Sequence, residues 1–529
     1  MEPEGSVRRE RYRPRVQPPP AKRLRKRHVG RIRSGSRPAR GPRGTTAGLA
    51  AELVRTAARS DPHPPLGRPS HGHAPIPCDN RPVPTHLGKP GRLLAVILVT
   101  LLVAILAACG GTPPSPTANA TPTASARGSD VPNGPSTPAP SDDLGAVYAA
   151  IEEQVVDIRG LEPRRPVEPL IVSPDEMAEI LAELVFEDAP EELLLAYERL
   201  YQAMGLMEAE ASLADVYVDL LESQVGGLYV PDGERLYVVS QEGELGAIER
   251  VLYAHEFAHA LQDQHFDLES VQVDLVDQTD RQLARQALVE GDAYVLNTQW
   301  MISHLVPTLS PDELQELIES STDPEALAAL ERIPPIVQSS ILFAATHGTQ
   351  WVLGLQGRGG WAAVDAAWER PPESTEQILH IEKYEAGEDP LDVALPSDLA
   401  GRLGPGWEVV LEDTFGEHQL GIWLSGNDAP SGIVATLPDV AADAAEGWGG
   451  DRVALLGGAD GETAVVLQTE WDTATDAGEF AERATAVLEE LGVIGLVARQ
   501  TGSASVRVFI GSDDATLLLL DRTLGHTGA

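Results

Sequence analysis

The chain of 529 residues is poor in cysteine, lysine and aromatic residues. It holds two cysteines, Cys78 and Cys109, which excludes a small fold held together by several disulfides. Aromatic residues make up only 5% of the chain, but 42% of its residues are hydrophobic, which suffices for two or more domains. The folded parts must therefore depend on hydrophobic cores.

Positive charge is scarce after the first 92 residues. Residues 1–92 carry 21 Lys and Arg against 6 Asp and Glu, whereas residues 93–529 carry 19 basic and 74 acidic residues, a net charge of −55. Lys383 is the only lysine after Lys89. Such an acidic surface repels phosphate backbones, so we expect no nucleic acid partner for the folded domains. The basic run 22–27 leaves open an arm that binds nucleic acid or anionic lipid.

A long apolar run, Leu93–Ala108, marks the point where the charge changes sign. It follows Lys89 and Arg92 and is short for a membrane-spanning helix, as in an export signal. Its exit, Leu106-Ala-Ala-Cys109, resembles the lipobox of bacterial lipoproteins, which implies cleavage before Cys109 and lipidation of this cysteine. We therefore expect an extracytoplasmic protein, lipid-anchored to the cell membrane through Cys109. An uncleaved anchor helix is the alternative.

The sequence predicts five segments. Residues 1–92 read as a basic, Pro- and Arg-rich disordered extension, which a wrongly assigned start codon would explain because an export signal acts at an N-terminus. Residues 93–109 are the signal peptide and lipobox, and residues 110–142 form a disordered tether rich in Pro, Thr, Ser, Ala and Gly. Residues 143–400 form a mainly helical domain, and residues 401–529 form a smaller α+β domain of unknown role.

Local patterns predict the main elements of these two domains. Ser173-Pro-Asp-Glu176 is typical of a capped helix start, and amphipathic runs follow at 190–204 and 210–223. Residues 225–239 predict a hairpin, because two β-rich runs flank Pro231-Asp-Gly-Glu234. In the second domain the expected strands are 407–411, 452–456, 463–469, 493–498 and 505–510, and the expected helices are 415–425, 432–445, 474–491 and 513–522.

The strongest chemical signal is His255-Glu-Phe-Ala-His259, an HExxH pattern within a helical run. Residues four apart share a helix face, so both imidazoles can bind one metal ion, and Glu256 is placed to activate a metal-bound water. Zinc suits this set, since catalytic zinc takes three protein ligands and keeps a position for water. About thirty residues later Glu290 is the expected third ligand. Asp292 is expected to hold a ligand histidine or to cap a break in the helix.

These motifs resemble those of the gluzincin metallopeptidases, the thermolysin-like clan. His255, Glu256 and His259 match the first helix of that clan, and Glu290-Gly-Asp-Ala matches the Glu-Gly-x-Ala often found on the second. The resemblance implies a zincin-like domain that binds zinc through the two histidines and Glu290. It also implies that the hairpin 225–239 provides an edge strand that borders the cleft and pairs with an extended substrate.

A closer resemblance covers most of residues 220–490. Three segments, His255–Asp267, Pro371–His380 and Trp448–Arg452, are similar to segments of an uncharacterised prokaryotic family of predicted zinc-dependent lipoproteins. That family carries no known substrate, so the similarity adds no substrate class.

Further polar residues are candidates for supporting roles. The oxyanion formed during hydrolysis needs a partner, and in this clan a Tyr or His from a later segment commonly provides it. His380 and Tyr384 are the candidates, with His347 third, although a capping or packing role for His380 stays open. Arg281 and Arg285, four residues apart, are predicted to form salt bridges rather than to clamp a substrate.

The sequence as a whole predicts an α+β protein with a mainly helical zincin-like domain, a short edge hairpin and a smaller α+β C-terminal domain. We expect a membrane-anchored, extracytoplasmic zinc metallohydrolase, and the favoured activity is that of a peptidase acting on peptides or proteins. One alternative is a non-catalytic binding or assembly lipoprotein on a zincin scaffold, and another is a hydrolase acting on other carbonyl compounds. Glu256 favours an enzyme, because a structural zinc site does not need it.

Overall fold

The computed structural model describes residues 7–11, 144–188, 191–216, 226–239, 245–271, 277–321, 330, 332–432 and 436–525. Within these ranges the protein is a mixed α+β structure, mostly helical, with one sheet of six strands and one of three. The export signal, Cys109 and the tether lie outside the described residues. Among the described helices, none is both long and apolar enough to cross a bilayer.

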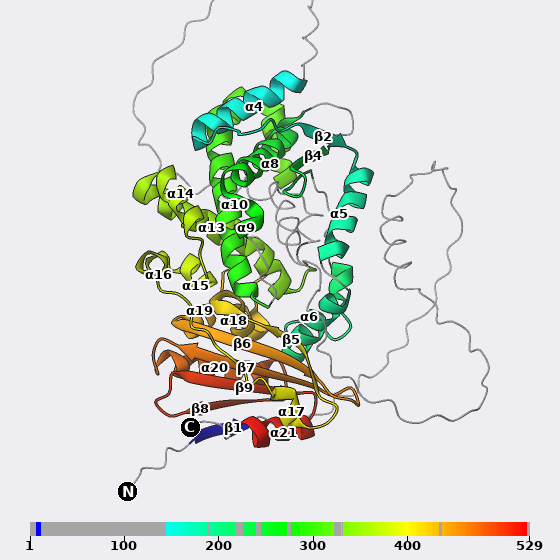
Figure 1. The fold of residues 1–529 in the computed structure, drawn as a ribbon, viewed down its shortest axis with the longest axis vertical. Coiled ribbons are helices and arrows are strands. Elements are labelled where there is room, and N and C mark those ends of the chain that lie inside the picture. Colours follow the sequence, from blue (N-terminus) through cyan, green and yellow to red (C-terminus); the bar gives the residue numbers. More distant parts are fainter. Residues whose placement is uncertain are drawn as a thin grey trace, which may run out of the picture.

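Three long helices form the centre of the helical part (Figure 1). They are α8 (Ala247–Phe266), α10 (Thr279–Trp300) and α13 (Pro335–Gly359). Helix α10 contacts both of the others. Its approach to α13 is unusually close at Gly291 and Gly348, where a Cβ on either glycine would lie 2.3 Å from a backbone oxygen of the other helix. Only glycine allows this contact, which sets the position of α10 along α13.

Shorter helices surround this centre. Ser173 precedes α5 (Pro174–Asp188) and forms the expected capping box, since its N–H and hydroxyl donate to Glu176 Oε2 at 2.8 Å each. The run expected at 190–204 is confirmed as α6, whereas residues 217–225 lie outside the described ranges. The surrounding helices are α4 (Leu144–Arg159), α5 (Pro174–Asp188), α6 (Glu191–Met204), α9 (Leu268–Val271), the π-helix Met301–Leu305, the 3₁₀-helix Val306–Thr308, α11 (Pro311–Ser321), α14 (Trp361–Glu369), α15 (Thr375–Leu379) and α16 (Ile381–Ala386).

The predicted hairpin is confirmed as β3 (Gly227–Val230) and β4 (Arg235–Val239). A third strand, β2 (Pro169–Val172), pairs with β4 in parallel and completes a sheet of order β2-β4-β3. The sequence did not predict β2, because four residues before a helix start carry too little periodicity to indicate a strand. In this sheet β3 is the edge strand nearest to α8.

The C-terminal part contains all five predicted strands, paired antiparallel in one six-stranded sheet of order β1-β8-β9-β7-β6-β5. Its first member, β1 (Val7–Arg11), comes from the basic extension, for which the sequence predicted no regular structure. It pairs with the backbone of β8, which would otherwise be an open edge. The other strands are β5 (Glu408–Asp413), β6 (Trp448–Gly457), β7 (Thr463–Trp471), β8 (Gly495–Gln500) and β9 (Ser505–Gly511).

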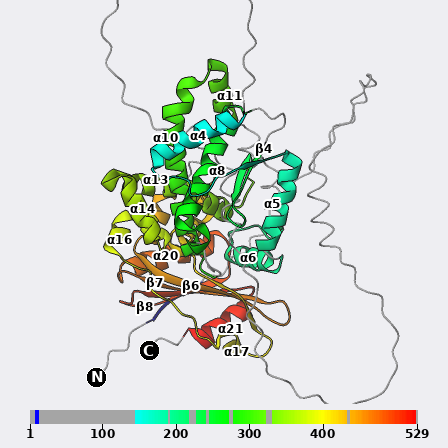
Figure 2. The same ribbon diagram turned by 45° about the horizontal axis from the view of Figure 1, so that its top comes forward.

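Both faces of this sheet are covered (Figure 2). Ala454 and Leu456 face the helices α17 (Leu399–Leu403) and α21 (Asp514–Leu524), which lie below the sheet in Figure 1. Val453 and Leu455 face the other way and belong to an apolar core that continues into the helical part. On that face lie α18 (Gly416–Leu424), the 3₁₀-helix Gly426–Asp428, α19 (Asp439–Ala445) and α20 (Asp476–Glu490). The two predicted domains therefore share one core.

Candidate metal centre

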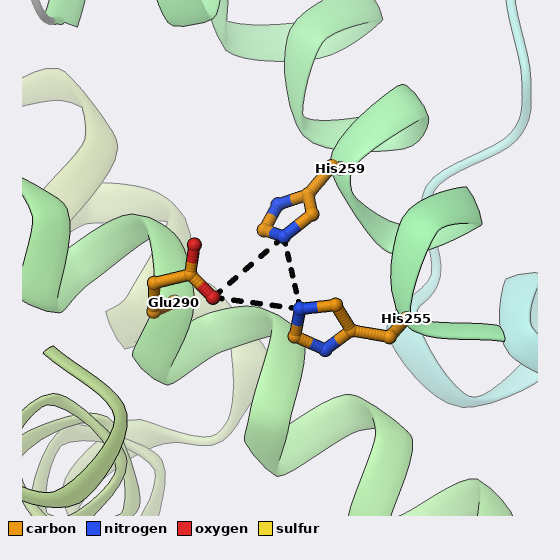
Figure 3. A group of neighbouring side chains, drawn as sticks. All are labelled: His255, His259 and Glu290. Atoms are coloured by element: carbon orange, nitrogen blue, oxygen red, sulfur yellow. Dashed lines mark hydrogen bonds and ion pairs between the residues drawn. The ribbon is translucent and has the colours of Figure 1, made fainter. Parts of the chain in front are cut away.

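Helices α8 and α10 bring the three predicted metal ligands together (Figure 3). His255 and His259 lie on one face of α8, one turn apart, and Glu290 reaches them from α10. The two Nε2 atoms are 3.1 Å apart, and Glu290 Oε2 lies 3.4 Å from that of His255 and 3.7 Å from that of His259. All three residues are fully buried.

The spacing of these atoms fits a zinc ion. Ligand atoms about 2.0–2.1 Å from a tetrahedral zinc lie about 3.3 Å from one another. Glu290 Oε2 is buried and has no hydrogen-bond partner within the described part of the chain, while its other oxygen accepts from Gln286 Nε2 at 3.1 Å. A buried carboxylate oxygen without a partner is costly, and a cation between the three atoms would remove that cost.

The electrostatics of the centre also suit a cation. Burial lowers the pKa of His255 to about 3 and lowers the pKa of His259, so both imidazoles are neutral, the form in which they bind metals. Burial raises the pKa of Glu290 to about 7. Burial, and then the nearby charge of Glu290, raise the pKa of Glu256 as well. Two neighbouring buried carboxylates thus favour protonation or a bound cation.

Glu256 is held by the edge strand of the small sheet. Its Oε2 accepts a 2.7 Å hydrogen bond from the backbone N–H of Tyr229, and its Oε1 is buried without a partner among the described residues. Val239 N–H donates to the Gly226 carbonyl, so Tyr229 takes a position at which its own N–H points away from β4. The outer edge of β3 therefore faces the HExxH helix.

Gln262, which the sequence analysis did not single out, orients a ligand histidine. Its Oε1 lies 2.9 Å from His259 Nδ1, and its Nε2 donates to the Val289 carbonyl of α10 at 3.0 Å. These contacts fix the ring so that Nε2 points into the centre. Its position three residues after His259, on the same helix face, is the signal that could have identified it.

Asp292 does not take the predicted role. Arg159 donates two 2.9 Å hydrogen bonds to its carboxylate, and Trp368 Nε1 donates a third at 2.8 Å. Two residues along a helix change direction by about 200°, so Asp292 faces away from the side of α10 that carries Glu290. Helix α10 also continues through this position, so Asp292 caps no break. Its role is to tie α4 and α14 to the helix that carries the third ligand.

Tyr294 is a further residue at the centre that the sequence analysis missed. It lies one turn after Glu290 on α10, and its ring centroid is 4.8 Å from that of His255. Burial, and then the carboxylates of Glu290 and Glu256, hold the pKa of Tyr294 well above its usual value. The spacing of four residues from Glu290 could have identified it.

The structure does not bring the predicted oxyanion partners to the centre. His380 Nε2 lies 2.8 Å from Glu417 Oε1, the hydroxyl of Tyr384 donates to the Arg370 carbonyl, and His347 stacks on Phe343. His380 follows α15, which is tied to the start of α10 by hydrogen bonds from Thr375 to Asp280. That end of α10 is ten residues, or about 15 Å along the axis, from Glu290. Arg281 and Arg285 form the predicted salt bridges, both with Glu373 at 2.7 Å.

A second group of carboxylates, Glu376, Glu388 and Asp472, is not a metal site. Lys383, the one lysine of the acidic region, lies 2.6, 2.8 and 2.6 Å from them. Its ammonium already occupies the space that a cation would need, and it joins α15 and α16 to the sheet domain.

Comparison with known proteins yields one match. Residues 407–519 match a family described as "Domain of unknown function (DUF8575)", a span that covers strands β5 to β9 of the six-stranded sheet and leaves out the metal centre. No curated protein and no solved structure matches the chain.

Proposed function

We propose that the protein is a zinc-dependent metallohydrolase with a zincin-type helical domain, and that it acts as a peptidase. One observation carries the proposal. His255, His259 and Glu290 bring three buried atoms that can bind a metal close together, and Glu290 Oε2 among them has no hydrogen-bond partner within the described structure. A structural zinc site normally has four protein ligands, whereas these three residues leave a position for water, and Glu256 lies beside them with a carboxylate oxygen that has no partner among the described residues. That oxygen supports a hydrolytic rather than a structural role.

The residues of the centre would share the work of hydrolysis. Zinc, when bound by His255, His259 and Glu290, would supply a Lewis acid that polarises a carbonyl group and lowers the pKa of water. Glu256 accepts a proton at Oε1 from the attacking water and delivers it to the leaving amine, while the Tyr229 N–H holds Oε2 in place. Gln262 keeps His259 in the orientation in which Nε2 faces the metal.

A peptide substrate is favoured by the edge of β3. The outward-facing backbone of this strand lies next to Glu256, so an extended peptide that paired with it would lie across the metal centre. Substrates without an extended backbone would lack these contacts. The proposed substrate is therefore a peptide or an extended segment of a protein.

The decisive experiment combines metal analysis with cleavage of a peptide library. Glu256→Gln should retain zinc and lose cleavage by about a hundredfold or more, because the amide cannot accept the proton. Glu249→Gln, on the same helix but outside the centre, is the matched control and should cleave like the wild type. Full cleavage by Glu256→Gln would overturn the proposal. A zinc-loaded wild type inert towards every peptide would instead favour an assembly or binding lipoprotein.

The proposed location outside the cytoplasm, anchored by lipid, rests on the sequence of the segment 93–109. Cys109→Ser should move the protein out of the membrane fraction and abolish labelling by a fatty-acid analogue. Unchanged membrane association of this variant would contradict the lipid anchor.

A further inference from the structure

A cavity of about 340 Å³ lies between α13, α18 and α19, apart from the metal centre. None of the metal-binding residues lines it. Asp443 and Glu446, which line one side, are exposed, so the cavity opens to the surface there. Its volume lies in the range of small-molecule sites.

One residue of the lining, Glu417, has a buried carboxylate oxygen without a hydrogen-bond donor. Glu417, on α18, is only 5% exposed and lines the cavity. Its Oε1 pairs with His380 Nε2 at 2.8 Å, but its Oε2 is buried with no partner among the described residues. Native proteins rarely leave such an atom unsatisfied, because removing it from water without a new hydrogen bond is costly. A ligand that reached this oxygen with a donor group would supply the missing hydrogen bond.

The charge around the cavity is negative. Glu417, Asp443 and Glu446 contribute carboxyl groups. The hydrogen bond to Glu417 raises the pKa of His380, and burial raises the pKa of Glu417 beside it. The other two histidines of the lining, His347 and His418, are neutral because burial lowers their pKa values to about 4 and about 3. Lys383, near by, is already bound to three carboxylates. A cationic ligand is therefore favoured over an anion.

Apolar side chains line much of the rest of the cavity, beside the polar side chains of Gln338, Ser339, Thr346 and Thr436. Leu342 and Phe343 line the cavity from α13, and Leu437 lines it from the segment before α19. A ligand that satisfies both kinds of wall has a positively charged hydrogen-bond donor at one end and an apolar body at the other.

We propose that this cavity binds a small organic amine, with its ammonium group donating to Glu417 Oε2 and its apolar body against Leu342, Phe343 and Leu437. The bond is charge-assisted and forms in a largely desolvated site, where it discriminates strongly against a neutral donor. The site goes beyond the proposed hydrolase activity. Helix α13 separates it from α10, because Gly348, next to His347, packs on Gly291.

The test is calorimetric titration of the full chain with phenethylamine and with phenethyl alcohol, its neutral analogue, near neutral pH. The amine should bind at one site per chain, and the alcohol should bind at least about tenfold more weakly. Glu417→Gln should weaken amine binding by at least about tenfold, whereas Glu382→Gln, an exposed carboxylate of α16 outside the cavity, should bind like the wild type. Binding of amine and alcohol with equal affinity, or absence of amine binding, would overturn the proposal.

A second variant keeps the test decisive if Glu417→Gln fails to fold. Ala442→Leu adds bulk to the part of the lining that α19 provides and leaves Glu417 in place, so it should reduce amine binding while circular dichroism and zinc content stay unchanged. Unaltered amine binding in a folded Ala442→Leu would contradict the assignment. Glu256→Gln and metal-free protein should bind the amine as the wild type does, so failure of the amine site and failure of the proposed hydrolase are distinguishable.

Discussion

The backbone N–H of Tyr229 donates a 2.7 Å hydrogen bond to Glu256 Oε2, joining the edge of the small sheet to the HExxH helix. The hydroxyl of Tyr229 also donates to Asp263 at 2.8 Å, two turns further along α8. A hydrogen bond to a carboxylate is worth about 1.5–3 kcal/mol. Strand β3 therefore lies beside Glu256 and also holds its side chain in place. Position 229 thereby connects the strand edge proposed to bind substrate to the proposed proton acceptor.

Gly227→Ala should disturb this arrangement without removing the metal. A Cβ at position 227 would lie 3.0 Å from Glu256 Cγ, so the carboxylate must move by a few tenths of an ångström. Such misplacement of a catalytic group costs activity steeply, and we expect cleavage to fall about tenfold or more while zinc content stays unchanged. The measurement is kcat/KM on a cleaved peptide together with metal analysis. Wild-type kcat/KM in this variant would argue against Glu256 as the proton acceptor.

Two glycines on α13 should respond in opposite ways to the same substitution. Gly348→Ala places a Cβ 2.3 Å from the Ala287 carbonyl oxygen, so the helices must separate, at a cost of about 1–3 kcal/mol. Gly357→Ala meets nothing within 4 Å and should stabilise the helix by about 0.5–1 kcal/mol. Urea unfolding of both variants gives the comparison. Equal unfolding free energies would show that the α10–α13 contact is less close than described.

Arg159→Met should leave a buried charge without its partner. Arg159 and Asp292 side chains are 1% and 0% exposed, and breaking such a pair costs about 3–5 kcal/mol. The double variant with Asp292→Asn should recover part of that loss, because the amide carries no charge. Arg402→Met, which removes an exposed pair with Asp398, is the control and should cost no more than about 0.5 kcal/mol. Denaturant unfolding would refute the prediction if Arg159→Met and Arg402→Met lowered the free energy of unfolding by the same amount.

Asp280 should make the stability of the protein depend on pH. It is 2% exposed, and burial raises its pKa from 3.8 to about 7. The folded state therefore favours the protonated form, and this stabilisation is complete below pH 3.8 and lost as the pH rises towards 7. Relative to Asp280→Asn, the unfolding free energy of the wild type should fall over this interval, by at most about 4 kcal/mol. A difference independent of pH would contradict the raised pKa.

Local patterns sufficed for most of the elements, although not for β1 and β2, and for the three metal-binding residues. The spacing of His255 and His259 needed only helical geometry, and Glu290 needed a second helix to lie beside the first, which α8 and α10 do. The alternating segments after residue 401 likewise gave the strands of the large sheet, because strand and helix periods differ locally.

Long-range pairings could not be predicted in this way. Arg159 and Asp292 are 133 residues apart, and neither position carries a local signal for the other. The same holds for His380, whose partner Glu417 comes from the next domain, and for β1, which joins the sheet from the far end of the chain. Such contacts depend on how elements pack in three dimensions, which periodicity along one element does not specify.

The most direct test of the metal centre is the zinc content of the purified full chain, compared with that of Glu290→Ala and Glu249→Gln. The wild type and Glu249→Gln should hold about one zinc per chain, and Glu290→Ala should bind zinc at least about a hundredfold more weakly, because it loses one of three protein ligands. A wild-type chain that remains free of zinc after incubation with the metal would contradict the proposed centre.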